Sequence, residues 1–430
     1  TPVFIVSATQ VMSDVPMLAL WVWAVYLWVS GERLRSMRRL LWASLLVAVC
    51  ALTKYFGMAL IPLLLVYSGM RHKCFRRHML ALLLPVALLA AYQLLTWRLY
   101  GRGLLLDAAD YTTMRTSIAW ISAVVGGLLF AGGCLLPIVL LTPFLFGRRM
   151  LLIGAFGLPV LSALLLSAIG ASGIRWPFDG FGLISSLLAL AFLAAGLVWI
   201  VLLVAELRVG ADASAVLLVL WMAGTFVFSV FVNWSLNGRT LLPMVPACGL
   251  LFARRLRPGS LKAGRGWLLA AFGGAAALAL APAWADYRLA NSSRLMVTRI
   301  HSACRDRTGE LWFQAHWGFQ YYMEQAGAKP LDLLRSSLKP GDRVVIPRNN
   351  TNVRPMDESW LGVVQVLTDT PTSWLTTMNP GTGASFYSDI WGPLPYALGR
   401  GDPEQYAILP IMREVNLKDT ARALNQAEGP

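Results

Sequence analysis

The sequence predicts a polytopic α-helical membrane protein with a small C-terminal α/β domain on the outer side of the membrane. Of its 430 residues, 57% are hydrophobic and only 14% are charged, and the mean hydropathy is +0.59. Soluble globular domains have about 25% charged residues, so this composition indicates a chain buried in lipid. Turn and polar residues return after Trp284. This change separates a membrane domain, residues 1–284, from an extracytoplasmic domain, residues 285–430.

The membrane domain contains about ten apolar segments. They are residues 14–30, 40–53, 57–70, 79–97, 118–146, 150–171, 184–205, 214–233, 240–253 and 266–284. Most are long enough to cross the hydrocarbon core as helices. Three of them, 40–53, 57–70 and 240–253, are too short to cross alone as straight helices.

Basic residues between these segments fall into two sets when the chain is threaded alternately across the membrane. Sixteen Lys and Arg residues lie on one side and six on the other, which indicates that the first side is cytoplasmic. The six are Lys54, Arg98, Arg102, Arg115, Arg175 and Arg239. We therefore expect an integral protein of the bacterial inner (plasma) membrane, surrounded by membrane lipids. The net charge of +15 does not indicate nucleic acid, because no nucleic-acid motif accompanies it.

The three short segments have their short ends on the outer face, near Lys54, Tyr55 and Arg239. Non-helical backbone at membrane depth occurs only where it lines a cavity or is buried in protein. One interpretation is an outward-opening cavity with Lys54 and Arg239 on its wall, where the Arg fork would bind an anionic lipid head group. The alternatives are ordinary spans with misplaced ends and an arginine that snorkels to the interface.

Acidic residues near the outer face are candidates for chemistry. Asp14 next to Pro16 either caps the first span or turns into the cavity. Asp107 and Asp110 lie three residues apart in the outer loop 98–117 and would share one face of a helix. Such a pair does acid–base work, holds a divalent ion, or belongs to a solvated loop balanced by its own arginines.

Histidines and cysteines predict no metal centre. His72, Cys74 and His78 have spacing that superficially resembles a metal site, but their strongly basic loop would repel a cation. Of the five cysteines, only Cys304 lies in the C-terminal domain, so that domain has no internal disulfide framework.

The C-terminal domain shows strand and helix patterns bounded by turn residues. The predicted strands are 310–314, 343–347, 363–367 and 406–411, and residues 317–326 read as a helix. Residues 370–405 are rich in Pro, Gly, Ser and Thr and are predicted to be loop. His316 and Trp317 begin an aromatic cluster that either packs the domain core or forms a sugar-stacking platform at the cavity mouth. Among nucleotide signatures, neither G-x-G-x-x-G nor Walker A is present.

Three motifs together resemble the GT-C superfamily of polytopic glycosyltransferases. They are Ser-Asp-Val-Pro at 13–16, Leu-Thr-Lys-Tyr-Phe-Gly-Met-Ala-Leu-Ile-Pro at 52–62, and Asn-Gly-Arg-Thr-Leu-Leu-Pro-Met-Val-Pro at 237–246. Their order and spacing are similar to the branch of protein mannosyltransferases and lipid A aminoarabinose transferases. The resemblance covers about residues 1–284.

This resemblance implies a GT-C-like fold and an enzyme that uses a sugar on a polyprenyl phosphate as donor. The sugar would pass to a lipid, glycan or protein acceptor on the outer side, with inversion at its anomeric carbon. Lys54 and Arg239 would contact the donor phosphate, and Asp14 would lie near the catalytic cavity. Tyr55, Asp107, Asp110, His316 and Trp317 are further candidates for the cavity or the acceptor site.

The family's principal acidic residue lies in the first outer loop, a region we expect to precede Thr1 in a longer chain. The general base therefore cannot be named, and neither can the ligands of a divalent metal ion, the one cofactor that the resemblance allows. Two other functions fit a polytopic protein of this kind: a transporter or flippase of lipid-linked sugars, and a membrane-anchored glycan-binding protein. A flippase would show inverted repeats and charges near the bilayer midplane, and no clear repeat is visible.

Overall fold

The computed structural model describes residues 1–113, 120–171, 182–256, 265–305, 308–350 and 353–417. These residues form two compact units. The first unit comprises Thr1–Ala283 and Thr377–Leu398, and the second comprises Trp284–Thr376 and Gly399–Pro430. Residues 377–398, which the sequence assigned to the C-terminal domain, thus belong to the first unit.

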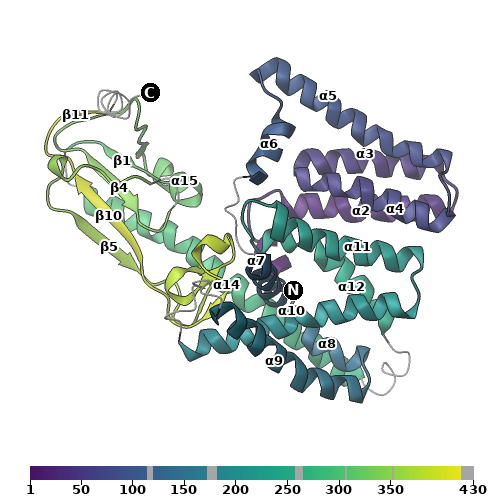
Figure 1. The fold of residues 1–430 in the computed structure, drawn as a ribbon. Helices are drawn as coiled ribbons and strands as arrows, with labels where there is room; N and C mark the ends of the chain where they lie inside the picture. Colours follow the sequence, from purple (N-terminus) through teal and green to yellow (C-terminus); the bar gives the residue numbers. More distant parts are fainter. Residues whose placement is uncertain (114–119, 172–181, 257–264, 306–307, 351–352, 418–430) are drawn as a thin grey trace. The chain divides into compact units, whose positions relative to one another are not determined.

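The first unit is built from helices (Figure 1). They are α1 (Pro2–Ala8), α2 (Asp14–Arg33), α3 (Met37–Thr53), α4 (Leu60–His72), α5 (Leu83–Tyr100), α6 (Leu104–Thr113), α7 (Trp120–Cys134), α8 (Ile138–Leu145), α9 (Arg148–Ala171), α10 (Leu183–Val209), α11 (Ala213–Val227), α12 (Met244–Arg255) and the N-terminal part of α14 (Arg265–Cys304), which continues into the second unit from Trp284. Every predicted apolar segment falls on one or two of them.

Among the described residues, six helices are long and apolar enough to cross a membrane, or seven if α7 and α8 form one bent span. The three segments predicted to be too short correspond to α3, α4 and α12, with 17, 13 and 12 residues. Helices are expected here because lipid offers the backbone no hydrogen-bond partners. The predicted architecture, a polytopic α-helical protein with a small C-terminal α/β domain, is confirmed.

The apolar segment predicted over residues 118–146 does not form one straight helix. The described part of this segment is broken between α7 and α8, whose axes are bent by 83°. Pro137 stands at the break and is the N-cap residue of α8. A proline has no backbone N–H and cannot continue the preceding helix, whereas its fixed φ suits the start of the next one.

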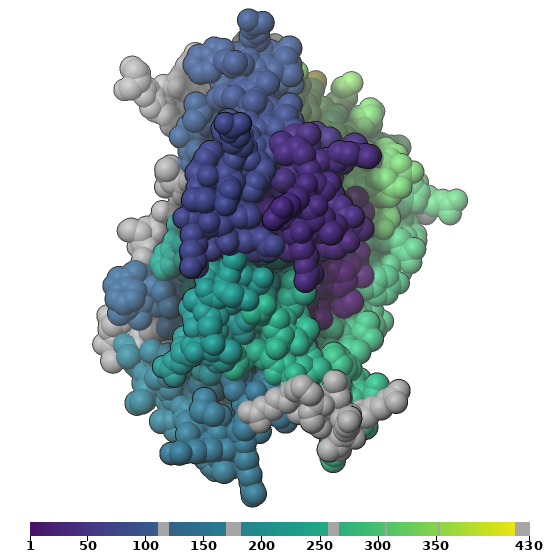
Figure 2. Space-filling view, turned by 90° about the vertical axis from the view of Figure 1, so that its right-hand side faces the viewer, coloured from purple at the N-terminus to yellow at the C-terminus, as the bar shows by residue number. Residues whose placement is uncertain are grey.

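Two glycines allow α7 and α10 to pack with their backbones in contact. A Cβ atom on Gly132 would lie 1.7 Å from the carbonyl oxygen of Phe192, and one on Gly196 would lie 2.3 Å from that of Leu128. Small residues at such crossings are typical of membrane helices, which associate through close packing. Elsewhere in the unit, α4 and α11 pack side by side, as the blue and teal surfaces in Figure 2 show.

The second unit contains a five-stranded sheet of order β2–β1–β4–β10–β5. Its strands are β1 (Leu311–Phe313), β2 (Lys329–Pro330), β4 (Arg343–Pro347), β5 (Gln365–Asp369) and β10 (Glu404–Pro410). Strands β2, β1 and β4 are parallel, and β10 runs antiparallel to both β4 and β5. The four predicted strands correspond to β1, β4, β5 and β10, and the predicted helix is α15 (Trp317–Gln325).

Both faces of this sheet are buried. Val345 and Ile408 pack on one face with α15 and the C-terminal part of α14. Val344 and Leu409 point to the opposite face and join a second cluster. The alternation of apolar residues toward two cores explains why β4 reads as a continuous apolar run.

Gly132→Ala should lower the free energy of unfolding by about 1–3 kcal/mol, because the new methyl group would overlap the backbone of α10. Thermal unfolding in detergent, followed by tryptophan fluorescence, measures the change. Gly224→Ala in α11 is the matched control, because no atom lies within 4 Å of its added Cβ. Equal destabilisation by both substitutions would contradict the close crossing of α7 and α10.

Candidate functional site

Asp14 is the first residue of α2 and is 2% exposed. The N-cap of α2 is Ser13, so the expectation that Asp14 caps the helix was wrong. A carboxylate in the first turn is favoured by the helix dipole. Its side chain, however, is engaged by two cations from other segments, which fits the alternative interpretation of an acid turned inward.

Lys54 stands at a break between two helices. It ends α3 in an extended conformation, with φ −155° and ψ 125°, and is followed by a 3₁₀ turn, η1 (Tyr55–Ala59), that leads into α4. Two neighbours explain the break. Phe56 packs its ring between those of Trp21 and Phe228, and a Cβ on Gly57 would lie 2.6 Å from the backbone of α3. The turn can therefore pack tightly on α3 only with glycine at this position.

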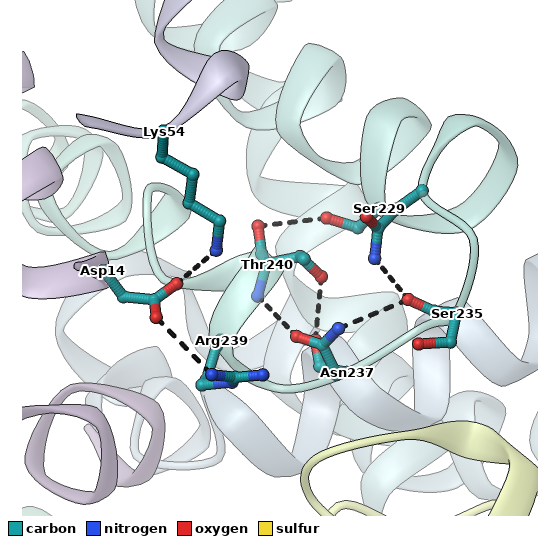
Figure 3. A network of polar contacts seen from close by, with 8 residues as sticks. Asp14, Lys54, Ser229, Ser235, Asn237, Arg239 and Thr240 are labelled. Atoms are coloured by element: carbon teal, nitrogen blue, oxygen red, sulfur yellow. Dashed lines mark hydrogen bonds and ion pairs between the residues drawn. The ribbon is translucent and has the colours of Figure 1, made fainter. Parts of the chain in front are cut away.

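Arg239 stands at a second break. A π-helical turn, η3 (Phe228–Val232), ends α11, and Arg239 opens a 3₁₀ turn, η4 (Arg239–Leu241), before α12. Hydrogen bonds fix the backbone around it: Asn237 Oδ1 accepts from Thr240 N at 3.0 Å, and Ser229 Oγ donates to Thr240 O at 3.0 Å. This turn holds the arginine side chain toward α2, as Figure 3 shows.

The three predicted residues meet (Figure 3). Lys54 Nζ donates to Asp14 Oδ1, and Arg239 Nη1 lies 3.8 Å from Asp14 Oδ2. Each carboxylate oxygen therefore faces a different cation. The side chains of Lys54 and Arg239 are 31% and 19% exposed, against 3% for Asp14. The site thus carries one excess positive charge, and the two cations retain access to a ligand.

Arg239 has donor capacity to spare. Its Nε–H is buried and has no hydrogen-bond partner among the described residues, and its contact with Asp14 is longer than a hydrogen bond. The face of the guanidinium lies over the ring of Tyr387, with Cζ 5.7 Å from the ring centroid. A buried donor without a partner costs free energy, so the Nε–H of Arg239 is suited to bind an acceptor group.

Residues 377–398 form hydrogen bonds with the turn that contains Arg239. Phe386 O accepts from Gly238 N at 2.8 Å, and Asp389 N donates to Leu236 O at 2.8 Å. Asp389 Oδ1 also accepts from Leu236 N at 3.0 Å. Gln10 Nε2 donates to the hydroxyl of Tyr387 at 2.6 Å. Sequence reasoning missed Gln10, Phe386, Tyr387 and Asp389. The last three lie in a stretch rich in Gly, Pro and Ser, which predicts a loop but does not predict what that loop packs against.

The remaining candidates of the first unit lie outside this ion-paired group. Tyr55 forms a hydrogen bond with Tyr92 through their hydroxyl groups, 3.3 Å apart. Asp107 pairs with Arg102 at 3.2 Å, and both side chains are solvent-accessible, which favours the solvated-loop interpretation. Asp107 and Asp110 share the helix α6, as their spacing predicted.

His316 and Trp317 belong to the second unit, where His316 is the N-cap residue of α15. Trp317 is 66% exposed, so it does not pack the core. Phe319 is buried there instead, in contact with Phe313 and Tyr406. The aromatic cluster is therefore divided between core packing and an exposed face.

The ion-paired group does not fit the divalent ion that the family resemblance allows. Asp14 supplies its one carboxylate, and both oxygens of that carboxylate face cations. Hard divalent ions need several oxygen ligands and a surplus of negative charge. The described residues around Asp14 thus lack the ligand set of a divalent cation, and no catalytic step is assigned to a metal.

Part of the chain, including two residues of this ion-paired group, is similar to a known family. Residues 1–97 match the model of the dolichyl-phosphate-mannose-protein mannosyltransferase family. The predicted resemblance to the GT-C glycosyltransferases is confirmed over residues 1–97. The match includes Asp14 and Lys54, and Arg239 lies outside it. It supports a membrane glycosyltransferase that uses a lipid-linked sugar donor. Neither the curated proteins nor the solved structures contain a match to the chain.

Gly238→Ala should displace Arg239, because the added methyl group would lie 2.6 Å from the fully buried ring of Phe386. The backbone itself tolerates alanine, since Gly238 has φ −58° and ψ −41°. We expect a loss of about 1–3 kcal/mol in unfolding free energy.

Phe386→Leu added to Gly238→Ala should restore most of that loss, and Gly249→Ala, with no atom within 4 Å of its Cβ, should change stability little. Thermal unfolding of the unsubstituted protein, Gly238→Ala, Phe386→Leu and the double variant forms a double-mutant cycle. A coupling energy near zero would show that residues 377–398 do not hold the Arg239 turn.

Proposed function

We propose that this chain transfers a sugar from a polyprenyl-phosphate-linked donor to a lipid, glycan or protein acceptor on the outer side of the membrane. The observation that carries the proposal is that Lys54 and Arg239 both face the carboxylate of Asp14, while the buried Nε–H of Arg239 has no partner among the described residues. A phosphate monoester or diester offers the oxygens that this donor set lacks. Arginine binds such oxygens through its planar fork, and lysine binds them as a point charge.

The placement of the two cations at helix breaks supports a lipid-linked phosphate. Lys54 follows α3 and Arg239 precedes α12, two of the three helices predicted to be too short to cross alone. Charged residues at membrane depth that face the protein interior commonly mark a substrate path. The anionic head group of a polyprenyl phosphate would enter there while its chain stays in lipid.

The chemical step is a single displacement. An acceptor oxygen or nitrogen attacks the anomeric carbon as the bond from that carbon to the phosphate oxygen breaks, so the configuration inverts. The electron pair of the broken bond goes to the leaving polyprenyl phosphate, and the acceptor's proton passes to a base. Lys54 and Arg239 stabilise the charge that develops on the phosphate, which lowers the barrier more than it stabilises the bound donor.

Asp14 acts in this scheme as a positioning residue. Both of its oxygens face the two cations, so neither is directed to a substrate. It balances one of the two positive charges and fixes Lys54 and Arg239 relative to each other. Preorganised charges of this kind require no rearrangement during the reaction.

Arg239→Ala should reduce sugar transfer by at least about 10²-fold while the protein stays folded, because the main phosphate donor is removed. The assay follows release of polyprenyl phosphate from a panel of polyprenyl-phosphate sugars by the protein in nanodiscs. Arg348→Ala, an exposed arginine of the second unit, is the control and should leave the rate unchanged.

Equal rates for Arg239→Ala and the unsubstituted protein would remove Arg239 from the mechanism. Binding of polyprenyl phosphate without any release would favour a flippase or a glycan-binding protein over a transferase.

Asp14→Asn should lower kcat by up to about 10²-fold and leave the affinity for polyprenyl phosphate within a few-fold, since both cations remain but are less well fixed. Steady-state kinetics together with phosphate-lipid binding separate the two effects. Asp357→Asn, the same change at an exposed site, is the control. Loss of binding as severe as in Arg239→Ala would show that Asp14 does more than position the cations.

A further inference from the structure

A second cluster of titratable side chains lies at the other end of α2. Glu32 precedes the last residue of α2, His72 is the last residue of α4, and His78 lies in the 3₁₀ turn η2 (Arg77–Leu82). His78 Nε2 is 3.3 Å from Glu32 Oε1, and His72 Nε2 is 3.6 Å from Glu32 Oε2. One ligand atom from each residue lies within 4.8 Å of the other two.

These separations suit a shared metal ion. Zinc binds imidazole nitrogen and carboxylate oxygen at about 2.0–2.2 Å, and two tetrahedral ligands are then about 3.3 Å apart. Imidazole also selects zinc-type transition metals over magnesium and calcium. With three protein ligands, the fourth position of a tetrahedral ion would take water.

The carboxylate of Glu32 is buried, and a chain of hydrogen bonds fixes its orientation. Trp28 Nε1 donates to Ser68 Oγ at 2.9 Å, and the hydroxyl of Ser68 donates to Glu32 Oε1. The side chain of Glu32 is fully buried, and Ser68 and Trp28 are 0% exposed. Such partners behind a ligand fix its orientation in metal sites.

Two atoms directed into the cluster lack hydrogen bonds. Glu32 Oε2 and His72 Nε2 are buried and have no hydrogen-bond partner in the described residues. Buried polar atoms are rarely left unpaired, and a metal ion would satisfy both. These two unsatisfied atoms, like the spacing of the three side chains, point to a bound ion.

Arg71 is the competing cation. Its Nε is 3.6 Å from Glu32 Oε2, and its Nη1 donates to the hydroxyl of Tyr67 at 3.2 Å. The Arg71 side chain is 36% exposed and long enough to withdraw toward solvent. An ion pair between Arg71 and Glu32 explains one buried charge, but it does not explain why two imidazoles converge on the same carboxylate.

We propose that Glu32, His72 and His78 bind one zinc-type divalent transition-metal ion that fastens the turn between α4 and α5 to the end of α2. Cys74, whose spacing from the two histidines superficially resembles a metal site, is exposed, and the third ligand is instead Glu32, 40 residues upstream of His72. The turn between α4 and α5 faces the viewer in Figure 2. Glu32 lies 18 residues beyond Asp14 on the same helix, about 27 Å away, so the ion site is distinct from the donor-phosphate site.

The test uses the full chain in detergent, freed of metal with a chelator and titrated with Zn²⁺ by calorimetry. We expect one ion per chain and a rise in melting temperature on adding Zn²⁺. Both should be lost in His78→Ala, whose partly exposed side chain can be removed without opening the core, and in Glu32→Gln. Ser68→Ala should weaken binding by about 10–100-fold.

His301→Ala and Cys74→Ser are the matched controls and should bind Zn²⁺ like the unsubstituted chain. Arg71→Ala should bind Zn²⁺ more tightly, because the competing cation is gone, whereas a plain ion-pair cluster would only lose stability. Absence of stoichiometric Zn²⁺ binding, or equal binding by His78→Ala, would overturn the proposal. Because polyprenyl phosphate binding is measured separately, failure here would leave the donor site untouched.

Discussion

The buried carboxylate of Asp14 is the constraint on which the site depends. A charge that is 97% removed from solvent needs ion pairs, because an unpaired buried charge costs several kcal/mol. Asp14 obtains its partners from two segments remote in sequence, the C-terminal end of α3 and the 3₁₀ turn η4 that precedes α12. Each cation stands at a break between two helices. The interruptions let Lys54 and Arg239 point into the protein, and the ion pairs in turn keep the interruptions in place.

The Arg239 turn also depends on residues from far along the chain. Backbone hydrogen bonds join Leu236 and Gly238 to residues 386–389, and Tyr387 covers the guanidinium. Residues 377–398 therefore belong to the site although they lie in sequence between strands β5 and β10 of the second unit. The Arg239 side chain, which would contact the phosphate, is therefore fixed by Asp14 of α2, by its own turn and by residues 377–398.

Much of the fold follows from the sequence because lipid leaves the backbone few choices. The apolar runs of the first unit form helices, and the predicted strands of the second unit appear where turn residues bound a short run with apolar residues. The bend at Pro137 was missed, since hydropathy sums do not register a change of direction. The membership of Asp14, Lys54 and Arg239 in one site could be proposed from charges at helix breaks. Their pairing, the role of residues 377–398 and the meeting of Glu32 with two histidines arise only from tertiary packing.

The most direct test of the account is a cryo-EM structure of the protein in nanodiscs with bound polyprenyl phosphate. We predict phosphate density within hydrogen-bond distance of the Arg239 guanidinium, including its Nε–H, and close to Lys54 Nζ. Asp14 should stay paired with Lys54 in that complex. Phosphate density at another place, with Arg239 still turned toward Asp14 and Tyr387, would contradict the assignment of this ion-paired group as the donor-phosphate site.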